Sequence, residues 1–364
     1  MSICRSGLSL CSALAFLLLM LCALPASAGP INARSAILMD VTTGKVLYEQ
    51  KPDLRIAPAS LTKVLSMYTA MEAISARKAD YQDKVKVSRK AARTRGSSMR
   101  LKTGDEVTLD KLFYGMAVAS GNDASMAVAE HIAGNDSAFV QRMNALAQRL
   151  GMKNSRFVNV HGMPGGTQYT TARDMLRMAR SYEAKYPRAK KYHLAKSVTH
   201  NRKTEPNHNP LVGYYRGLNG LKTGWTCDAG YSIIVSAKRN GHKLIGVILG
   251  APNTGVRASE ARRLLNAGFK SLSKPKVTVY SELGVRNKAL KKNKARSSRK
   301  AVASRPTSSK AVKKNVAPQN RKKKAQTAKA VPPKAAPKPA PAPAPRSLSP
   351  ADEAIASLKA ESRK

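Results

Sequence analysis

The strongest signal for a β-sheet in this sequence is the stretch YSIIVSAKRNGHKLIGVIL, residues 231–249. Two apolar runs, at 231–236 and 243–249, flank the pair Asn240-Gly241. This pair favours the tight turn of an antiparallel hairpin, because both residue types tolerate a positive φ. The stretch therefore predicts two adjacent antiparallel strands near the end of the folded region.

A second hairpin is predicted near the start of the chain, where apolar runs at 35–40 and 45–49 flank a turn that contains Gly44. Between the hairpins, apolar residues recur at helical spacing and predict helices over 60–76, 110–133, 136–150 and 171–185, with Asp110 and Asp136 as N-terminal caps. A last helix is expected over 258–269. Strands at both ends of a helical region predict an α+β fold: an antiparallel β-sheet flanked by helices, with an inserted all-helical subdomain.

The first 28 residues predict a secretory signal peptide. Arg5 precedes an apolar run over 8–24, and Ala26-Ser-Ala28 offers the small residues of a cleavage site near Ala28. A retained membrane helix, or a lipoprotein signal at Cys22, is a weaker alternative. We therefore expect an exported protein, periplasmic or associated with the cell envelope. The mature chain keeps one cysteine, Cys227, which we expect to be a packed strand residue rather than a nucleophile.

The end of the chain is rich in Lys, Ala, Pro and Ser. Residues 271–364 hold 25 Lys and Arg but only 4 Asp and Glu, in a protein of net charge +44. Such a segment buries too little apolar surface to order itself, so we expect a disordered basic tail over 273–364 and a folded domain over 29–272. The charge suits anionic envelope polymers or a membrane surface, and no specific nucleic acid is predicted. A polyanion-binding protein with an inactive enzyme domain is one alternative.

The predicted helix at 60–76 begins with Ser60-Leu-Thr-Lys63. Residues three apart lie on one face of a helix, so the Lys63 amine can reach the Ser60 hydroxyl. A buried lysine of lowered pKa can take the proton of such a serine and make it a nucleophile. The Ser-x-x-Lys pattern also begins at Ser75, Ser271, Ser273 and Ser297, but only the first copy opens an apolar helix in the folded region.

Two further motifs carry polar side chains. Ser120-Gly-Asn122 breaks two apolar helical stretches, which is costly unless its side chains find partners; a simple capping turn is the alternative. The word LKTG occurs at 101–104 and again at 221–224. The first copy leads into a turn. The second precedes the strong strand at 231–236, and a strand could hold Lys222 and Thr223 toward a cleft while Gly224 admits a substrate backbone.

Ser-x-x-Lys, Ser-x-Asn and Lys-Thr-Gly, in this order, resemble the signature of penicillin-binding proteins and β-lactamases. The similarity runs from about residue 33 to 269, includes Asn159-Val-His-Gly-Met163, and is nearest to the low-molecular-mass penicillin-binding proteins, serine-type D-alanyl-D-alanine carboxypeptidases with a β-lactamase/transpeptidase-like fold. The resemblance implies that Ser60 attacks the penultimate D-alanine and that Lys63 takes the serine proton. It also implies that Ser120 relays a proton to the leaving group, while Asn122 holds Lys63 and the substrate amide.

On the substrate side, the resemblance implies that Lys222 and Thr223 bind the terminal carboxylate beside Gly224, and that the backbone N–H groups of Ser60 and Trp225 form an oxyanion hole. The expected substrates are peptidoglycan stem peptides, the expected inhibitors are β-lactam antibiotics, and no cofactor is expected. The histidines lack a metal-binding pattern, and His161 is expected to be a non-catalytic loop residue. A D,D-endopeptidase or a β-lactamase remains an alternative, although no convincing deacylating glutamate lies between residues 120 and 222.

Overall fold

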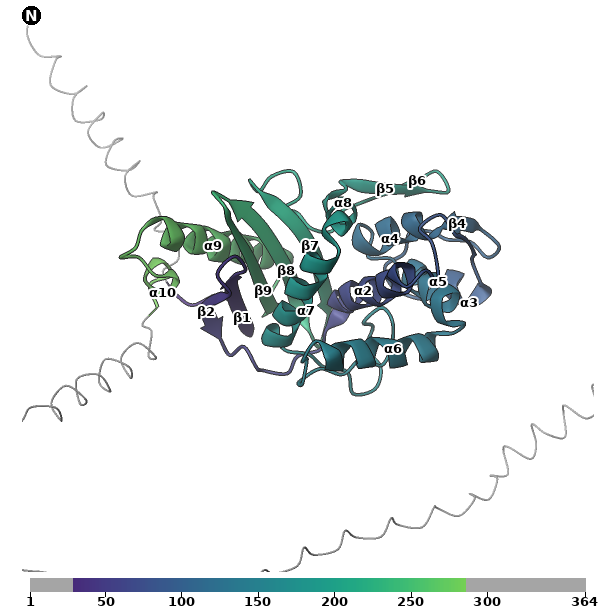
Figure 1. Ribbon diagram of the computed structural model, residues 1–364, viewed down its shortest axis with the longest axis horizontal. Helices are drawn as coiled ribbons and strands as arrows, with labels where there is room; N and C mark the ends of the chain where they lie inside the picture. Colours follow the sequence, from purple (N-terminus) through teal and green to yellow (C-terminus); the bar gives the residue numbers. More distant parts are fainter. Residues whose placement is uncertain (1–28, 286–364) are drawn as a thin grey trace, which may run out of the picture. The chain divides into compact units, whose positions relative to one another are not determined.

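A five-stranded antiparallel sheet forms one part of the structure, a computed structural model that describes residues 29–285 (Figure 1). The strand order is β2-β1-β9-β8-β7. The strands are β1 (Ser35–Asp40), β2 (Lys45–Gln50), β7 (Leu218–Thr226), β8 (Gly230–Arg239) and β9 (His242–Ala251). Both predicted hairpins are present, and β1 pairs with β9, so the sheet joins the two ends of the folded region. The expected signal peptide and residues 286–364 of the expected tail lie outside the described residues.

Helices cover both faces of this sheet. Because side chains alternate along a strand, Ile234 faces one hydrophobic cluster and Val235 faces the other. The cluster around Ile234 includes residues of α7 (Ala172–Lys185), and the cluster around Val235 includes residues of α9 (Thr254–Ser273). Figure 1 shows α7 and α9 on opposite sides of the strands. In the strand order, β7 lies at one edge of the sheet, and Figure 1 shows it next to the inserted region.

The inserted region between β2 and β7 is mainly helical. Its central helix is α2 (Thr62–Ser75), which is buried on every side from Thr62 to Met71. The other helical elements are η1 (Ala59–Leu61), α3 (Arg89–Ala92), α4 (Leu109–Ala117), α5 (Asn122–Ala133), α6 (Asp136–Arg149), η2 (Pro187–Ala189) and α8 (Lys190–Leu194). The insert also contains two small sheets that the sequence analysis did not predict, formed by β3 (Lys84–Lys86) with β4 (Glu106–Thr108) and by β5 (Ser197–His200) with β6 (Lys203–Pro206).

The helix predicted over 110–133 is in fact two helices, α4 and α5, separated by the turn that contains Ser120. The two predicted caps are wrong. Thr108 caps α4 and Asn135 caps α6, each through a side-chain oxygen that accepts a backbone N–H. Asp110 and Asp136 lie in the first turn instead, where a negative charge still interacts favourably with the helix dipole.

Two expectations near the C-terminal part of the fold need correction. The tail was expected from residue 273, but α10 (Val279–Glu282) follows α9 and buries Val279 and Leu283 in the same hydrophobic cluster. The ordered fold therefore extends to residue 285. Cys227 is exposed in the turn between β7 and β8, because it follows the last residue of the strand. Within residues 29–285, every helix is too short or too polar to cross a bilayer.

Candidate active site

Ser60 and Lys63 lie one turn apart where η1 passes into α2. The Lys63 Nζ atom is 3.1 Å from the Ser60 Oγ atom, and the Lys63 side chain is fully buried. Ala59, directly before the serine, has a φ of +47°, a conformation that costs a non-glycine residue about 1–3 kcal/mol and is typical of functional sites. The structure thus brings the predicted hydroxyl and amine into direct contact.

The remaining neighbours of the Lys63 amine are neutral oxygens. Nζ lies 2.6 Å from the Asn122 Oδ1 atom and 2.9 Å from the His161 carbonyl oxygen. Burial lowers the pKa of Lys63 well below its ordinary value, and the nearby charge of Lys222 lowers it further, against an opposing effect of Asp123. A neutral amine can donate its two N–H groups to Asn122 and His161 while its lone pair faces Ser60. The geometry is therefore that of a general base.

The turn between α4 and α5 delivers the second motif to the same place. Ser120 is 3% exposed, has a φ of +58°, and lines a pocket together with Ser60. Asn122 begins α5, and its Nδ2 group donates to the Arg95 carbonyl at 2.6 Å. This bond fixes the amide so that Oδ1 faces Lys63. The buried amide of Asn122 is thus paired on both its oxygen and its nitrogen side.

The edge strand β7 carries the second LKTG copy past η1. Lys222 is 1% exposed, and its Nζ donates to the Thr223 carbonyl at 2.9 Å. Burial and the charge of Arg257 lower the pKa of Lys222 to about 7. A Cβ atom on Gly224 would lie only 3.1 Å from the Ser60 backbone nitrogen, so a side chain at this position would crowd the start of η1.

A pocket of about 380 Å³ opens between these elements. Trp225, 52% exposed, and Tyr231 form an aromatic wall, with ring centroids 5.6 Å apart. The lining residues are Ser60, Ser97, Ser120, His208, Thr223, Gly224, Trp225, Tyr231, Thr254 and Arg257. The predicted site residues thus converge on one cavity, with Lys63, Asn122 and Lys222 buried directly behind its lining.

Sequence reasoning missed Arg257, which α9 contributes from beyond the motifs. This side chain is 6% exposed, and its Nε atom is buried without a hydrogen-bond partner among the described residues. Burial lowers its pKa to about 10, so the guanidinium is charged at neutral pH. A buried charge without a partner is costly, which suits a pocket that receives an anion. No sequence motif identifies this arginine. It lies in the first turns of α9, after the N-cap Asn253.

Two histidines also contribute in ways that the sequence did not reveal. His161 acts through its backbone carbonyl, which accepts a hydrogen bond from Lys63, while burial lowers the pKa of its ring to about 4. The next residue, Gly162, has a φ of +87°, and a Cβ there would lie 1.8 Å from the Ala59 oxygen. Only a glycine permits this packing. His208 lines the pocket, and burial lowers its pKa to about 4 as well.

The first LKTG copy lies outside the pocket, and Lys102 is exposed there. Residues 29–285 contain no group of three His, Cys, Asp or Glu that could hold a metal ion. The arrangement suits acyl transfer: a serine nucleophile, a buried amine as base, and cationic groups for an anionic substrate.

Comparisons with known proteins agree with this chemistry. The family model for peptidase S11, D-alanyl-D-alanine carboxypeptidase, matches residues 23–253. The chain is 40% identical over 248 residues to the D-alanyl-D-alanine carboxypeptidase DacC of Escherichia coli. The alignment covers 66% of this chain and 62% of that protein. The chain is 38% identical over 243 residues to DacF of Bacillus subtilis, covering 65% of this chain and again 62% of the relative. The match thus spans about three fifths of the length of these relatives.

Solved structures show the same fold. Penicillin-binding protein 5 from Haemophilus influenzae superposes with a TM-score of 0.65 at 36% identity, over 67% of this chain and 73% of that one. Penicillin-binding protein D2 from Listeria monocytogenes, in an ampicillin-bound form, superposes with a TM-score of 0.61 at 27% identity, over 66% and 98% of the two chains. The expected transpeptidase-like fold is confirmed by these neighbours.

Proposed function

Because this chain belongs to the peptidase S11 family of D-alanyl-D-alanine carboxypeptidases, we propose that it removes the terminal D-alanine from peptidoglycan stem peptides through an acyl-enzyme on Ser60. The observation that carries the proposal is the 3.1 Å contact between the Ser60 hydroxyl and the buried Lys63 amine. Lys222 and Arg257 add positive charge on the other side of the same site. A nucleophile, a base and a site for a carboxylate are the three parts that this reaction needs.

Acylation follows from these contacts. The Ser60 Oγ atom attacks the carbonyl carbon of the penultimate D-alanine, and its proton passes to the Lys63 Nζ atom. The peptide C–N bond then breaks, and the departing D-alanine takes a proton from Lys63 through Ser120. Water hydrolyses the resulting ester in a second step and restores the serine. Asn122 holds Lys63 and the substrate amide during both steps.

Charge and backbone groups stabilise the reacting atoms. Lys222, Thr223 and Arg257 hold the terminal carboxylate, and this anchors the scissile bond beside Ser60. The backbone N–H groups of Ser60 and Trp225 donate to the oxygen that becomes negative in the tetrahedral intermediate. Each such donor contributes about 3 kcal/mol in comparable enzymes. The close approach of Gly224 to η1 sets the separation of these two donors.

β-Lactam antibiotics are proposed to acylate the same serine. Among the described residues that line the pocket, none is Asp or Glu. Without a carboxylate to activate water, the ester formed with a β-lactam should persist, so the chain is proposed to be a target of these drugs rather than a β-lactamase. Slow stoichiometric labelling by nitrocefin is expected, whereas rapid turnover would favour the β-lactamase alternative.

The direct test is the release of D-alanine from a soluble peptide that ends in D-Ala-D-Ala. Ser60→Ala should release none above background, since the nucleophile is gone, and should take up no penicillin. Mass spectrometry of the penicillin-treated wild type should place the adduct on the peptide that contains Ser60. Equal release by wild type and Ser60→Ala would overturn the proposal. The same assay with a cross-linked dimer of stem peptides reports endopeptidase activity.

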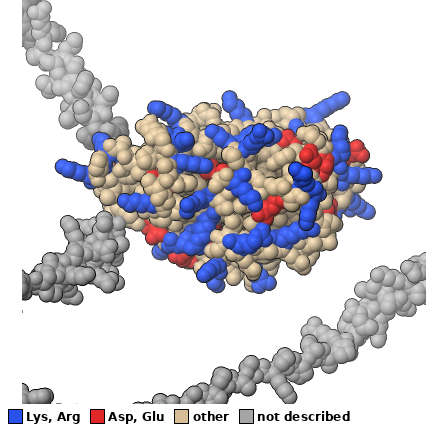
Figure 2. Space-filling view, in the orientation of Figure 1, with Lys and Arg blue, Asp and Glu red and all other residues tan. Residues whose placement is uncertain are grey.

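We also propose that the protein is exported and acts in the cell envelope, where its charge helps to retain it. Lys and Arg side chains cover much of the face shown in Figure 2, with few Asp and Glu between them. Residues 286–364 add more Lys and Arg. Deleting these residues should leave the activity on a short peptide unchanged and weaken retention on anionic envelope polymers or membranes; lost activity would contradict this division of roles.

A further inference from the structure

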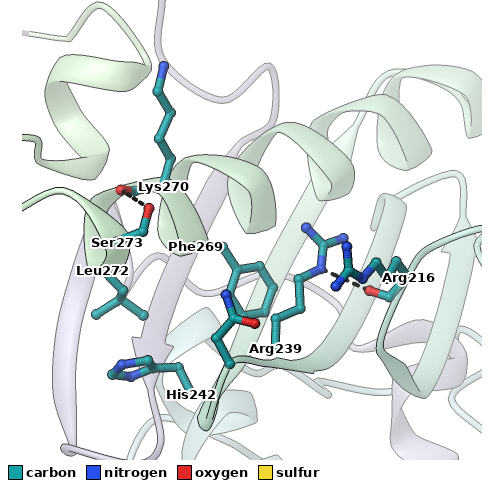
Figure 3. Close-up of a pocket in the computed structure, with 8 residues that line it drawn as sticks. Arg216, Arg239, His242, Phe269, Lys270, Leu272 and Ser273 are labelled. Atoms are coloured by element: carbon teal, nitrogen blue, oxygen red, sulfur yellow. Dashed lines mark hydrogen bonds between the residues drawn. The ribbon is translucent and has the colours of Figure 1, made fainter.

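Figure 3 shows a second pocket, of about 530 Å³. It lies at the other end of β8 from the active site. Tyr231, near the start of this strand, lines the active site, whereas Arg239, at its end, lines the second pocket. Eight residues of extended strand separate the two positions by roughly 26 Å. The second pocket lies between the β8–β9 turn and the last residues of α9, and its size is typical of ligand sites.

Two arginines lie on one side of this pocket (Figure 3). The Arg239 Nε group donates to the Arg216 carbonyl at 3.0 Å. Its guanidinium also stacks on Tyr215 and Phe269, 4.4 Å and 4.8 Å from the ring centroids. Arg239 is therefore held in place before any ligand arrives. The exposed Arg216 guanidinium makes no hydrogen bond or ion pair within the described part of the chain.

The other basic side chains of the pocket already have acidic partners. Lys270 binds Glu282 at 2.8 Å, and His242 contacts Asp40 at 3.2 Å. The lining residues are Arg216, Arg239, Asn240, His242, Phe269, Lys270, Leu272 and Ser273, with no Asp or Glu among them. The two guanidiniums are thus the cationic groups of this described pocket that have no acidic partner.

We infer that this pocket binds the terminal carboxylate of a second peptidoglycan stem peptide while the active site processes the first. Two guanidiniums match a planar carboxylate through parallel N–H donors. The Asn240 amide can pair with a peptide group, and Phe269 and Leu272 offer apolar contact to an alanine methyl. The inference rests on the proposed function, which brings the chain to a polymer whose uncrosslinked stem peptides each end in a carboxylate.

The placement of the arginines argues against a simpler role as counter-charges for the end of α9. The helix end carries partial negative charge, but its Lys270 carbonyl already accepts from Ser273 Oγ and from the Lys274 backbone. Arg239 comes from the strand side and stacks on aromatic rings instead, and Arg216 lies in the segment just before β7. A lipid surface is a poorer match, because Arg239 is half-buried in a concave site and not presented on a flat face.

A second contact on the same polymer should raise apparent affinity without changing the chemistry. Once one stem peptide is bound, the next binds from a high effective concentration, so two weak contacts act together. The pocket should therefore matter for whole peptidoglycan and not for a short soluble peptide.

The test uses the full-length chain and sedimentation with purified peptidoglycan sacculi at fixed salt. Arg216→Gln/Arg239→Gln, placed in Ser60→Ala so that the ligand stays intact, should weaken binding about tenfold, the size expected for lost charge-assisted hydrogen bonds. Arg180→Gln/Arg262→Gln is the matched control, since it removes the same charge from exposed positions outside the pocket. This control should weaken binding less than twofold.

A single variant, Arg216→Glu, guards against misfolding, because this exposed side chain makes no hydrogen bond or ion pair with residues 29–285. It should weaken sacculus binding at least as much, with unchanged thermal unfolding. With Ser60 present, Arg216→Glu should keep its kcat/KM on a short D-Ala-D-Ala peptide within twofold.

Three results would overturn the inference: equal losses in the arginine pair and its control, no loss in Arg216→Glu, or a larger loss on phosphatidylglycerol vesicles than on sacculi. A wild type that binds sacculi through these arginines but releases no D-alanine from the short peptide would have a different outcome. It would refute the proposed reaction and still support a binding role for the second pocket.

Discussion

The same four residues, Leu-Lys-Thr-Gly, occupy two very different places in this protein. At 101–104 they form a turn in which Lys102 is exposed, the Asp105 N–H donates to the Lys102 carbonyl, and Gly104 takes a φ of +87°. At 221–224 they form part of β7, where all four residues are buried and pair with β8. Local sequence is identical, so the surroundings alone make the difference.

The two copies differ in the tertiary contacts that hold them. The buried Asp123 carboxylate fixes the first copy by accepting the Leu101 N–H at 3.1 Å, and this bond shapes the loop. The second copy is held by pairing with β8, and Lys222 lies buried there with its Nζ donating to the Thr223 carbonyl. Under the proposed function, a strand edge beside Ser60 gives Lys222 a role that a solvated turn cannot give Lys102.

The largest expected effect comes from removing each lysine in turn. Lys222→Ala should lower kcat/KM on a D-Ala-D-Ala peptide on the order of 10²- to 10³-fold, as truncating one partner of a buried charge pair typically does. Lys102→Ala should stay within twofold, because the side chain is exposed and remote from the pocket. Steady-state release of D-alanine measures both. Comparable losses in the two variants would remove the distinction between the copies.

The glycines should separate activity from stability. Gly224→Ala should lower kcat/KM about 10- to 100-fold, since the new methyl group would press on η1, 3.1 Å from the Ser60 nitrogen, and small misplacements of reacting groups are costly. Gly104→Ala meets no atom within 4 Å but must adopt a positive φ, so it should lower the free energy of unfolding by about 1 kcal/mol and leave activity intact. Chemical denaturation and kinetics on both variants test whether Gly224→Ala lowers activity and Gly104→Ala lowers stability. A Gly104→Ala enzyme with impaired turnover would contradict this expectation.

Much of this contrast was predictable from the sequence, because the flanking residues differ. Strand periodicity at 231–249 implied a sheet next to the second copy, and Asp105 with the following residues implied a turn after the first. Ser60 and Lys63 were predictable as neighbours since helical spacing places them on one face. The two terminal hairpins were equally readable, because alternation and a turn pair are local signals.

Other features depend on contacts between distant segments, and local patterns do not report them. Arg257 enters the pocket only because α9 packs across β8, and the His161 carbonyl reaches Lys63 only because Gly162 fits against Ala59. The caps were mispredicted by one or two residues, since several polar residues near each helix start could serve. Burial in the assembled fold, which sequence spacing does not give, sets the pKa of Lys222.

The pKa of Lys222 leads to the smallest expected effect on activity. This effect should be specific to the second LKTG copy. A pKa of about 7 means that Lys222 is charged below pH 7 and loses its proton above it, so attraction for a substrate carboxylate weakens as the pH rises. Between pH 7 and 8, kcat/KM on a D-Ala-D-Ala acid should fall by up to about fivefold, because the charged fraction of a group with this pKa falls from about one half to about one eleventh. Arg257, whose pKa is about 10, keeps its charge over this range and preserves part of the binding. The corresponding C-terminal amide has no carboxylate to attract and should show no such fall. In Lys222→Ala the acid and the amide should share one profile; a fall of equal size for both substrates in the wild type would assign the titration to a different group.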